Sequence, residues 1–151
     1  MVIFFLQHQN ILPSVEDLQI NMGEDLCCGW NFAFNKEYEF VTDIGNNSSN
    51  VSKLLTDFFR FYIHFPYETH IICLLVGQPV KRYNLKYSFN MPNILSESPS
   101  FGSKKDKLKL NKILVVQDPF ELAKNVARSV SKSNIGKCKP FLYIFIYQFG
   151  S

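Results

Sequence analysis

The first half of the chain carries the spacing of amphipathic helices. The longest helix is expected over residues 51–64, where apolar side chains recur three and four positions apart. These side chains would form one buried face, which consists of Leu54, Leu55, Phe58, Phe61 and Tyr62. The apolar run at residues 1–8 is typical of the end of a helix, and residues 14–20 are typical of a short helix after Pro13.

The second half carries strand patterns. Residues 69–76 form an apolar run typical of a buried strand, which Gly77 ends. Residues 80–89 alternate and indicate a second strand, and residues 108–117 indicate a third strand before a helix at about 119–132. Helices packed with a small sheet of this kind predict an α+β fold.

The last residues break the pattern. Residues 141–147 are apolar and aromatic, and they indicate a strand or an exposed apolar tail that favours aggregation. The 151 residues are 46% hydrophobic and 19% charged, a composition that supports one core. We therefore expect one domain.

Polar groups gather where the third predicted strand ends. Asp118 stops the apolar run, Pro119 suits the first position of a helix, and Glu121 falls at the third. This is the pattern of a capping box, in which Asp118 accepts hydrogen bonds from first-turn amides and Glu121 reaches back to the Asp118 amide. In that interpretation both carboxylates have only a local role.

The same residues resemble the nucleotide-recognition motif of the poly(A) polymerase and terminal uridylyltransferase family. In that family Asp-Pro-Phe-Glu is followed by His-Asn-Val and often by an arginine. Upstream, the helix pattern from Leu54 to Tyr62, the segment Gly29-Trp30-Asn31 and the proline turn at residues 11–14 also resemble the family, in family order. The resemblance covers about residues 1–132 and implies the C-terminal part of the nucleotidyltransferase central domain, called the PAP-associated domain. From Ser133 onward the family pattern has a further amphipathic helix, so residues 133–151 are expected to be a divergent or truncated tail.

The resemblance implies a role for each polar residue of the motif. Asp118 and Glu121 would accept hydrogen bonds from the base edge or its waters, Asn125 would hold the turn, and Arg128 would face phosphate or RNA. Lys124 stands where uridylyltransferases commonly carry histidine. Since lysine donates hydrogen bonds but accepts none, it suits uracil O4 better than the adenine amino group, which favours UTP over ATP. Alternatively, Lys124 extends into solvent or pairs with Glu121.

The catalytic part of the family is not found in the sequence. The resemblance implies an N-terminal palm domain with a Gly-Ser turn and an Asp-x-Asp pair that binds two Mg²⁺ or Mn²⁺ ions, and the sequence contains no Asp-x-Asp pair. The acidic pairs Glu16-Asp17, Glu24-Asp25 and Glu37-x-Glu39 lie in segments typical of solvated surface. We therefore expect a C-terminal fragment that binds no metal ion and is inactive alone, its partners being a nucleoside triphosphate, an RNA 3′ end and the missing catalytic domain.

Charge is unevenly distributed along the chain. The net charge is +3, but residues 1–50 hold one basic and seven acidic side chains, whereas residues 101–151 hold ten basic and three acidic ones. Lysines that lead into the motif would attract RNA phosphates, namely Lys104, Lys105, Lys107, Lys109 and Lys112. Alternatively, they form a solvated loop that keeps a sheet edge soluble.

Two observations bear on the setting. Cys27, Cys28, Cys73 and Cys138 have neither zinc-site spacing nor the density of a disulfide scaffold. The first residues lack the basic start of a signal peptide and the length of a membrane span. The expected location is intracellular, in the nucleus or cytoplasm, without membrane contact. A non-catalytic module that binds RNA or a protein remains the alternative function.

Overall fold

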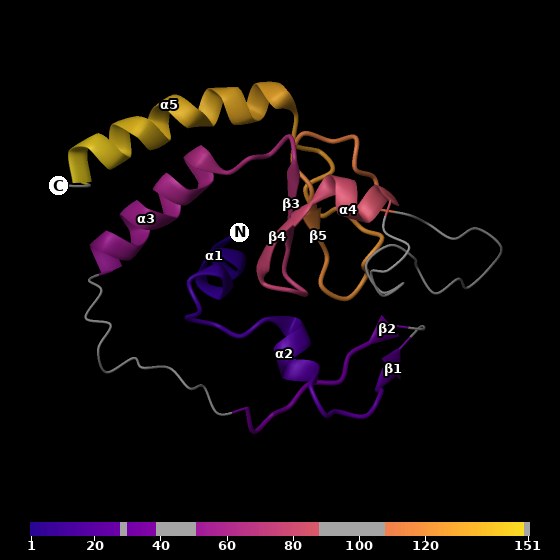
Figure 1. Cartoon of the computed structure of the whole chain (residues 1–151). Coiled ribbons are helices and arrows are strands. Elements are labelled where there is room, and N and C mark those ends of the chain that lie inside the picture. The colour runs from indigo at the N-terminus through magenta and orange to yellow at the C-terminus, as the bar shows by residue number, and fades with distance from the viewer. Residues whose placement is uncertain (28–29, 39–50, 88–107, 150–151) are drawn as a thin grey trace.

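The computed structural model describes residues 1–27, 30–38, 51–87 and 108–149 (Figure 1). Its helices are α1 (Val2–His8), α2 (Val15–Gln19), α3 (Val51–His64), α4 (Arg82–Tyr87) and α5 (Lys132–Phe149). Its strands are β1 (Leu26–Cys27), β2 (Trp30–Asn31), β3 (His70–Cys73), β4 (Gln78–Lys81) and β5 (Val116–Gln117). This mixture of helices and a small sheet confirms the predicted α+β class.

The sheet is built around β3. It has three strands in the order β4-β3-β5, with β4 antiparallel to β3 and β5 parallel to it. β3 and β5 share only two register pairs, Ile72 with Val116 and Cys73 with Gln117. β1 and β2 form a separate antiparallel pair.

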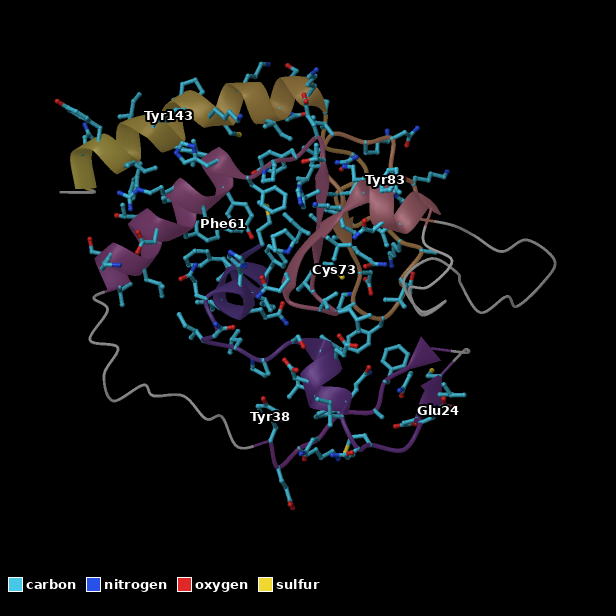
Figure 2. The ribbon with its side chains drawn as sticks, in the orientation of Figure 1. Glu24, Tyr38, Phe61, Cys73, Tyr83 and Tyr143 are labelled. Atoms are coloured by element: carbon cyan, nitrogen blue, oxygen red, sulfur yellow. The ribbon has the colours of Figure 1, made fainter. Side chains whose placement is uncertain are left out.

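The three predicted N-terminal helices are confirmed, and aromatic side chains pack between α1 and α3. Phe5 of α1 meets Phe61 with ring centroids 5.8 Å apart, and Figure 2 labels Phe61 in this region. The Tyr62 hydroxyl donates to the Met1 carbonyl over 2.6 Å, which fixes the start of α1 against α3. One member of the predicted buried face, Leu55, is 42% exposed, because it lies about 100° around the helix from Leu54, which packs against the core.

The strand predictions were too long. β3 ends at Cys73 and a turn follows it to Gly77. Of the alternating segment 80–89, residues 80–87 form the end of β4 and α4, and residues 88 and 89 lie outside the described residues. The Arg82 amide donates to Thr69 O beside the hairpin, and Leu85 of α4 then packs against the core. Tertiary packing therefore overrides the local alternation at this point.

Residues 108–117 contain strand only at β5, and the helix predicted over about 119–132 is wrong. Residues 118–130 form consecutive turns. Their main-chain groups make hydrogen bonds to partners that do not follow the i to i−4 pattern of an α-helix. The Asp118 amide donates to Lys124 O over 3.0 Å, and the Val126 amide donates to Val116 O over 3.0 Å.

Of the two alternatives for residues 141–147, the strand is wrong, because this segment belongs to α5. The exposed apolar tail is observed in part, since Phe141 and Tyr147 are exposed. Ser131 and Asn134 form the start of this helix: the Asn134 amide donates to Ser131 Oγ, and Asn134 Oδ1 accepts from the Ser131 amide. α5 lies alongside α3 (Figure 1), where Phe145 contacts Phe59 at a centroid distance of 4.7 Å. A helical partner thus outweighs the strand propensity of the aromatic residues.

Candidate functional site

The polar residues of the predicted motif lie on a loop, residues 118–128, whose main chain is held by hydrogen bonds of the Asn125 side chain. This side chain is buried, and its Oδ1 accepts hydrogen bonds from the Val116 amide (3.0 Å) and the Ala127 amide (2.9 Å). Its Nδ2 donates to Leu114 O over 3.0 Å. One amide group therefore fixes the end of the loop to β5 and to the residues before it.

Asp118 organises the beginning of the loop. Its Oδ1 accepts from the Phe120 and Glu121 amides, both at 2.9 Å, as the capping interpretation predicts for its side chain. The second half of that interpretation is wrong, because the Asp118 amide is bound by Lys124 O and Glu121 does not reach back to it. The residues close a turn instead of beginning a helix.

Glu121 and Lys124 form an ion pair at the surface of the loop. Lys124 Nζ lies 3.0 Å from Glu121 Oε2, and the two side chains are 47% and 52% exposed, respectively. The pairing that the sequence left open is thus observed, and at this exposure it contributes little to folding. Arg128 is exposed, and within the described ranges its guanidinium has no hydrogen bond or ion pair. Three exposed polar side chains, those of Glu121, Lys124 and Arg128, are therefore carried by a main chain that hydrogen bonds hold in place.

A buried polar chain connects the loop to the centre of the sheet. The Cys73 thiol donates to Gln117 Oε1 (3.1 Å), and Gln117 Nε2 donates to Leu122 O (2.8 Å). Burial raises the pKa of Cys73 to about 11, so the thiol stays protonated near neutral pH and acts as a donor. Cys73 lies among the buried side chains of the sheet (Figure 2). Nothing in the sequence indicates this role for Gln117 beyond its place at the end of an apolar run.

An aromatic stack joins the loop to the segment around β2. The rings of Phe32 and Phe120 are nearly parallel, with an angle of 18° and a centroid distance of 4.8 Å. Phe32 is 37% exposed and Phe34 is 52% exposed. Phe32, which follows β2, thus supports the loop through Phe120, a contact that sequence spacing alone could not identify.

The predicted lysines are only partly described. Lys104, Lys105 and Lys107 lie outside the described residues, whereas Lys109 and Lys112 are exposed. Among the acidic pairs, Asp17 completes a capping box with Ser14. Within the described residues, no group of three or more His, Cys, Asp or Glu side chains is placed to hold a metal ion. No helix in the same ranges is long and apolar enough to cross a membrane.

Comparison with known proteins places this geometry in a family context. A family model described as Cid1 family poly A polymerase matches residues 50–124. The chain is 32% identical to the Speckle targeted PIP5K1A-regulated poly(A) polymerase of Xenopus tropicalis over 87% of its own length, but it spans only 14% of that protein. It is 28% identical to the terminal uridylyltransferase cid1 of Schizosaccharomyces pombe, over 89% of this chain and 32% of the relative.

A solved structure has the same fold. The crystal structure of mtPAP in complex with ATPγS superposes with a TM-score of 0.67 at 18% sequence identity. The superposition covers 96% of this chain and 26% of that chain. The arrangement of helices and sheet is therefore that of one part of a larger nucleotidyltransferase structure.

Proposed function

The chain belongs to the Cid1 family of poly(A) polymerases and terminal uridylyltransferases, and we propose that it is the base-recognition and RNA-binding part of a template-independent RNA 3′-end nucleotidyltransferase. The observation that carries this proposal is the loop at residues 118–128. Its main chain is fixed by Asn125 and Asp118, while Glu121, Lys124 and Arg128 are exposed. A rigid main chain with polar ends in solvent suits the recognition of a small polar ligand.

The chemistry of the loop favours a base that offers both a donor and an acceptor. The Glu121 carboxylate accepts hydrogen bonds only, and Lys124 donates only. Uracil presents N3–H beside O4, so one uracil edge can meet both residues. The adenine amino group cannot accept from Lys124, so adenine would have to offer its ring nitrogen N1 instead. We propose that UTP is preferred over ATP and that the Glu121–Lys124 ion pair opens or shares its groups with the base. Arg128 would then face a phosphate group.

Nucleotidyl transfer requires metal-binding residues that the described ranges of this chain do not contain. Nucleotidyl transfer uses two divalent metal ions, Mg²⁺ or Mn²⁺, held by clustered carboxylates. Asp118 does not fit this role because its Oδ1 already accepts from two amides, and no other cluster of suitable ligands lies within the described residues. We propose that a catalytic domain outside residues 1–151 supplies these carboxylates, and that the chain acts inside the cell on RNA 3′ ends. Purified 1–151 is expected to transfer no nucleotide to RNA.

The test is nucleotide choice by the full-length protein that contains this region. Glu121→Gln adds a donor where the loop offered an acceptor, and Lys124→His adds an acceptor. Each change is expected to alter the UTP-to-ATP ratio of kcat/KM by about 1–3 kcal/mol, with Lys124→His raising the preference for UTP in line with the family resemblance. Competition of both nucleotides for one RNA primer measures this ratio.

Two controls make the result specific. Glu37→Gln, a change at an exposed carboxylate outside the loop, should leave the ratio unchanged. Melting temperatures of all variants should stay close to the wild-type value. Unchanged ratios for both loop variants, with folding intact, would return the loop to a purely structural role and would favour the alternative of a non-catalytic interaction module.

A further inference from the structure

A groove lies where α5 begins. The residues that line it do not include Glu121 and Lys124, the ion pair of the base-recognition loop (residues 118–128). It consists of two adjoining hollows of about 450 and 470 Å³. Four lining residues are common to both hollows, namely Tyr67, Glu68, Ile113 and Lys132. The first hollow extends along α5 to Lys139, and the second extends to Lys112 and Arg82.

The charge of this groove is predominantly positive. Lys112, Lys132 and Lys139 line it against one acidic residue, Glu68. In the part of the chain that the structure describes, none of these four side chains has a hydrogen bond or ion pair. The lysine charges are therefore not neutralised by a neighbouring carboxylate, and α5 itself contains no acidic residue.

The spacing of the lysines suits an extended ligand. Lys132 and Lys139 are seven residues apart on α5, so they lie on the same side of the helix and about 10 Å apart along its axis. Lys112 comes from the segment before β5, at the other end of the groove. Cations that are spread along a groove match a polymer of phosphates better than a single phosphate group.

Arg82 contributes charge to the groove but no free donors. Its guanidinium donates five hydrogen bonds to main-chain carbonyls, those of Tyr67, His70, Leu110, Lys112 and Ile113. Burial lowers the pKa of Arg82, but an arginine stays protonated near neutral pH. It fixes one wall of the groove and adds a positive potential, while the lysines remain the groups that can contact phosphate.

We propose that this groove binds the phosphodiester backbone of single-stranded RNA, so that the RNA lies beside the base-recognition loop. The inference rests on the proposed function, which supplies RNA as the substrate. The groove is close to the loop along the chain, because Val130 and Ser131 line it and come two and three residues after Arg128. Lys112, Lys132 and Lys139 hold phosphates, and Glu68 opposes them.

Matched substitutions in the 151-residue chain test the groove. Lys132→Gln combined with Lys139→Gln is expected to weaken binding of a fluorescein-labelled oligouridylate about tenfold, because two phosphate contacts are lost. The slope of log K against log salt, measured by anisotropy between about 50 and 200 mM KCl, should fall by about 0.7 for each contact. Glu68→Gln should instead strengthen binding, a result that a merely structural role would not produce.

Lys137→Gln is the matched control, since Lys137 is exposed on the same helix but does not line the groove. It should change neither the affinity nor the salt slope. Equal losses for Lys137→Gln and for the groove variants, or no measurable binding by the wild type, would overturn the proposal.

Two further probes identify the source of the phosphate. If the groove variants weaken UTP binding but leave oligouridylate binding unchanged, the groove holds a triphosphate and the RNA assignment is wrong. Equal competition by polyglutamate would show an unspecific anion surface and would also overturn it. Nucleotide choice by the loop variants is a separate measurement, so failure of the groove would leave the proposed function standing.

Discussion

Single side chains hold together the segment that carries the candidate site. Asn125 and Gln117 supply hydrogen bonds to main-chain groups that have no partner in a regular strand or helix. A buried amide or carbonyl without a partner is costly, so these side chains are needed for the loop to exist. Their importance follows from the main-chain groups that they bind rather than from their own burial.

Asn125→Ala is therefore expected to lower the free energy of unfolding by about 2–4 kcal/mol, because it leaves buried main-chain groups at Val116 and Leu114 without partners. Asn125→Asp keeps the acceptor oxygen but loses the Nδ2 donor and buries a carboxylate against the Leu114 carbonyl, so a loss at least as large is expected at neutral pH. Urea denaturation measures both. Val126→Ala, at the exposed neighbouring position, should cost about 0.5 kcal/mol or less, and an Asn125→Ala loss of similar size would contradict the assigned role.

At the scale of elements, sequence patterns were reliable where a helix has one apolar face. The spacing over residues 51–64 gave the bounds of α3, and Ser14 after Pro13 marked the start of α2. The patterns failed where long-range contacts decide. The change from β4 to α4 at Arg82 depends on distant carbonyls, and α5 depends on packing against α3.

The candidate site was predictable as a set of residues but not as a geometry. The order Asp-Pro-Phe-Glu identified the loop, and the i, i+3 spacing of Glu121 and Lys124 allowed their ion pair. The turn itself could not be predicted, because Asp118 and Pro119 are equally suited to begin a helix. Long-range hydrogen bonds select the turn over the helix. They are the bond from the Asp118 amide to Lys124 O and the bonds of Asn125 to residues before the loop.

The turn after β3 requires glycine, and a substitution there tests how α1 and α2 are attached to the sheet. Gly77 has φ of +69°, and a Cβ at this position would lie 3.2 Å from the Cβ atoms of Gln7 and Ser14. Gly77→Ala is expected to cost about 1–3 kcal/mol, since it adds backbone strain to a tight contact. Thermal and urea denaturation both report this loss.

Gly136→Ala provides the matched control. Gly136 lies within α5, and a Cβ there would have nothing within 4 Å. The same substitution should therefore stabilise the protein by about 0.5–1 kcal/mol through helix propensity. Equal effects of the two substitutions would show that the turn at residue 77 has no special requirement.

For the whole molecule, buried titratable groups make folding sensitive to high pH. Burial raises the pKa of Cys73 to about 11, that of Tyr67 to about 12, and that of Tyr62 further in the same direction. In the unfolded chain these groups lose protons at lower pH than in the folded protein. The unfolded state then binds fewer protons, so the free energy of unfolding falls as pH rises.

The free energy of unfolding is thus expected to be unaffected by these groups below about pH 9 and to decrease above it. Cys73→Ser replaces the thiol by a hydroxyl that can still donate to Gln117, but that does not titrate in this range. Its stability should decline less steeply between pH 9 and 11 than that of the wild type. Urea denaturation across this range measures the difference, with Cys138→Ser at an exposed thiol as the control; identical slopes for wild type and Cys73→Ser would argue against the buried thiol as a cause.

The brevity of β5 has a consequence for motion. β5 pairs with β3 through two residues only. Residues 108–130 are otherwise attached to the sheet by the hydrogen bonds of Arg82, by the Cys73–Gln117 hydrogen bond and by buried apolar side chains. We expect this segment to open before the β3–β4 hairpin does, so hydrogen exchange should reveal two levels of protection. The Ile72 amide, which donates to Val115 O between the two parts, should exchange by this local opening, whereas the β3–β4 amides should exchange only when the whole protein unfolds. The Val126 amide, whose bond to Val116 O lies within the segment, should exchange faster in Asn125→Ala.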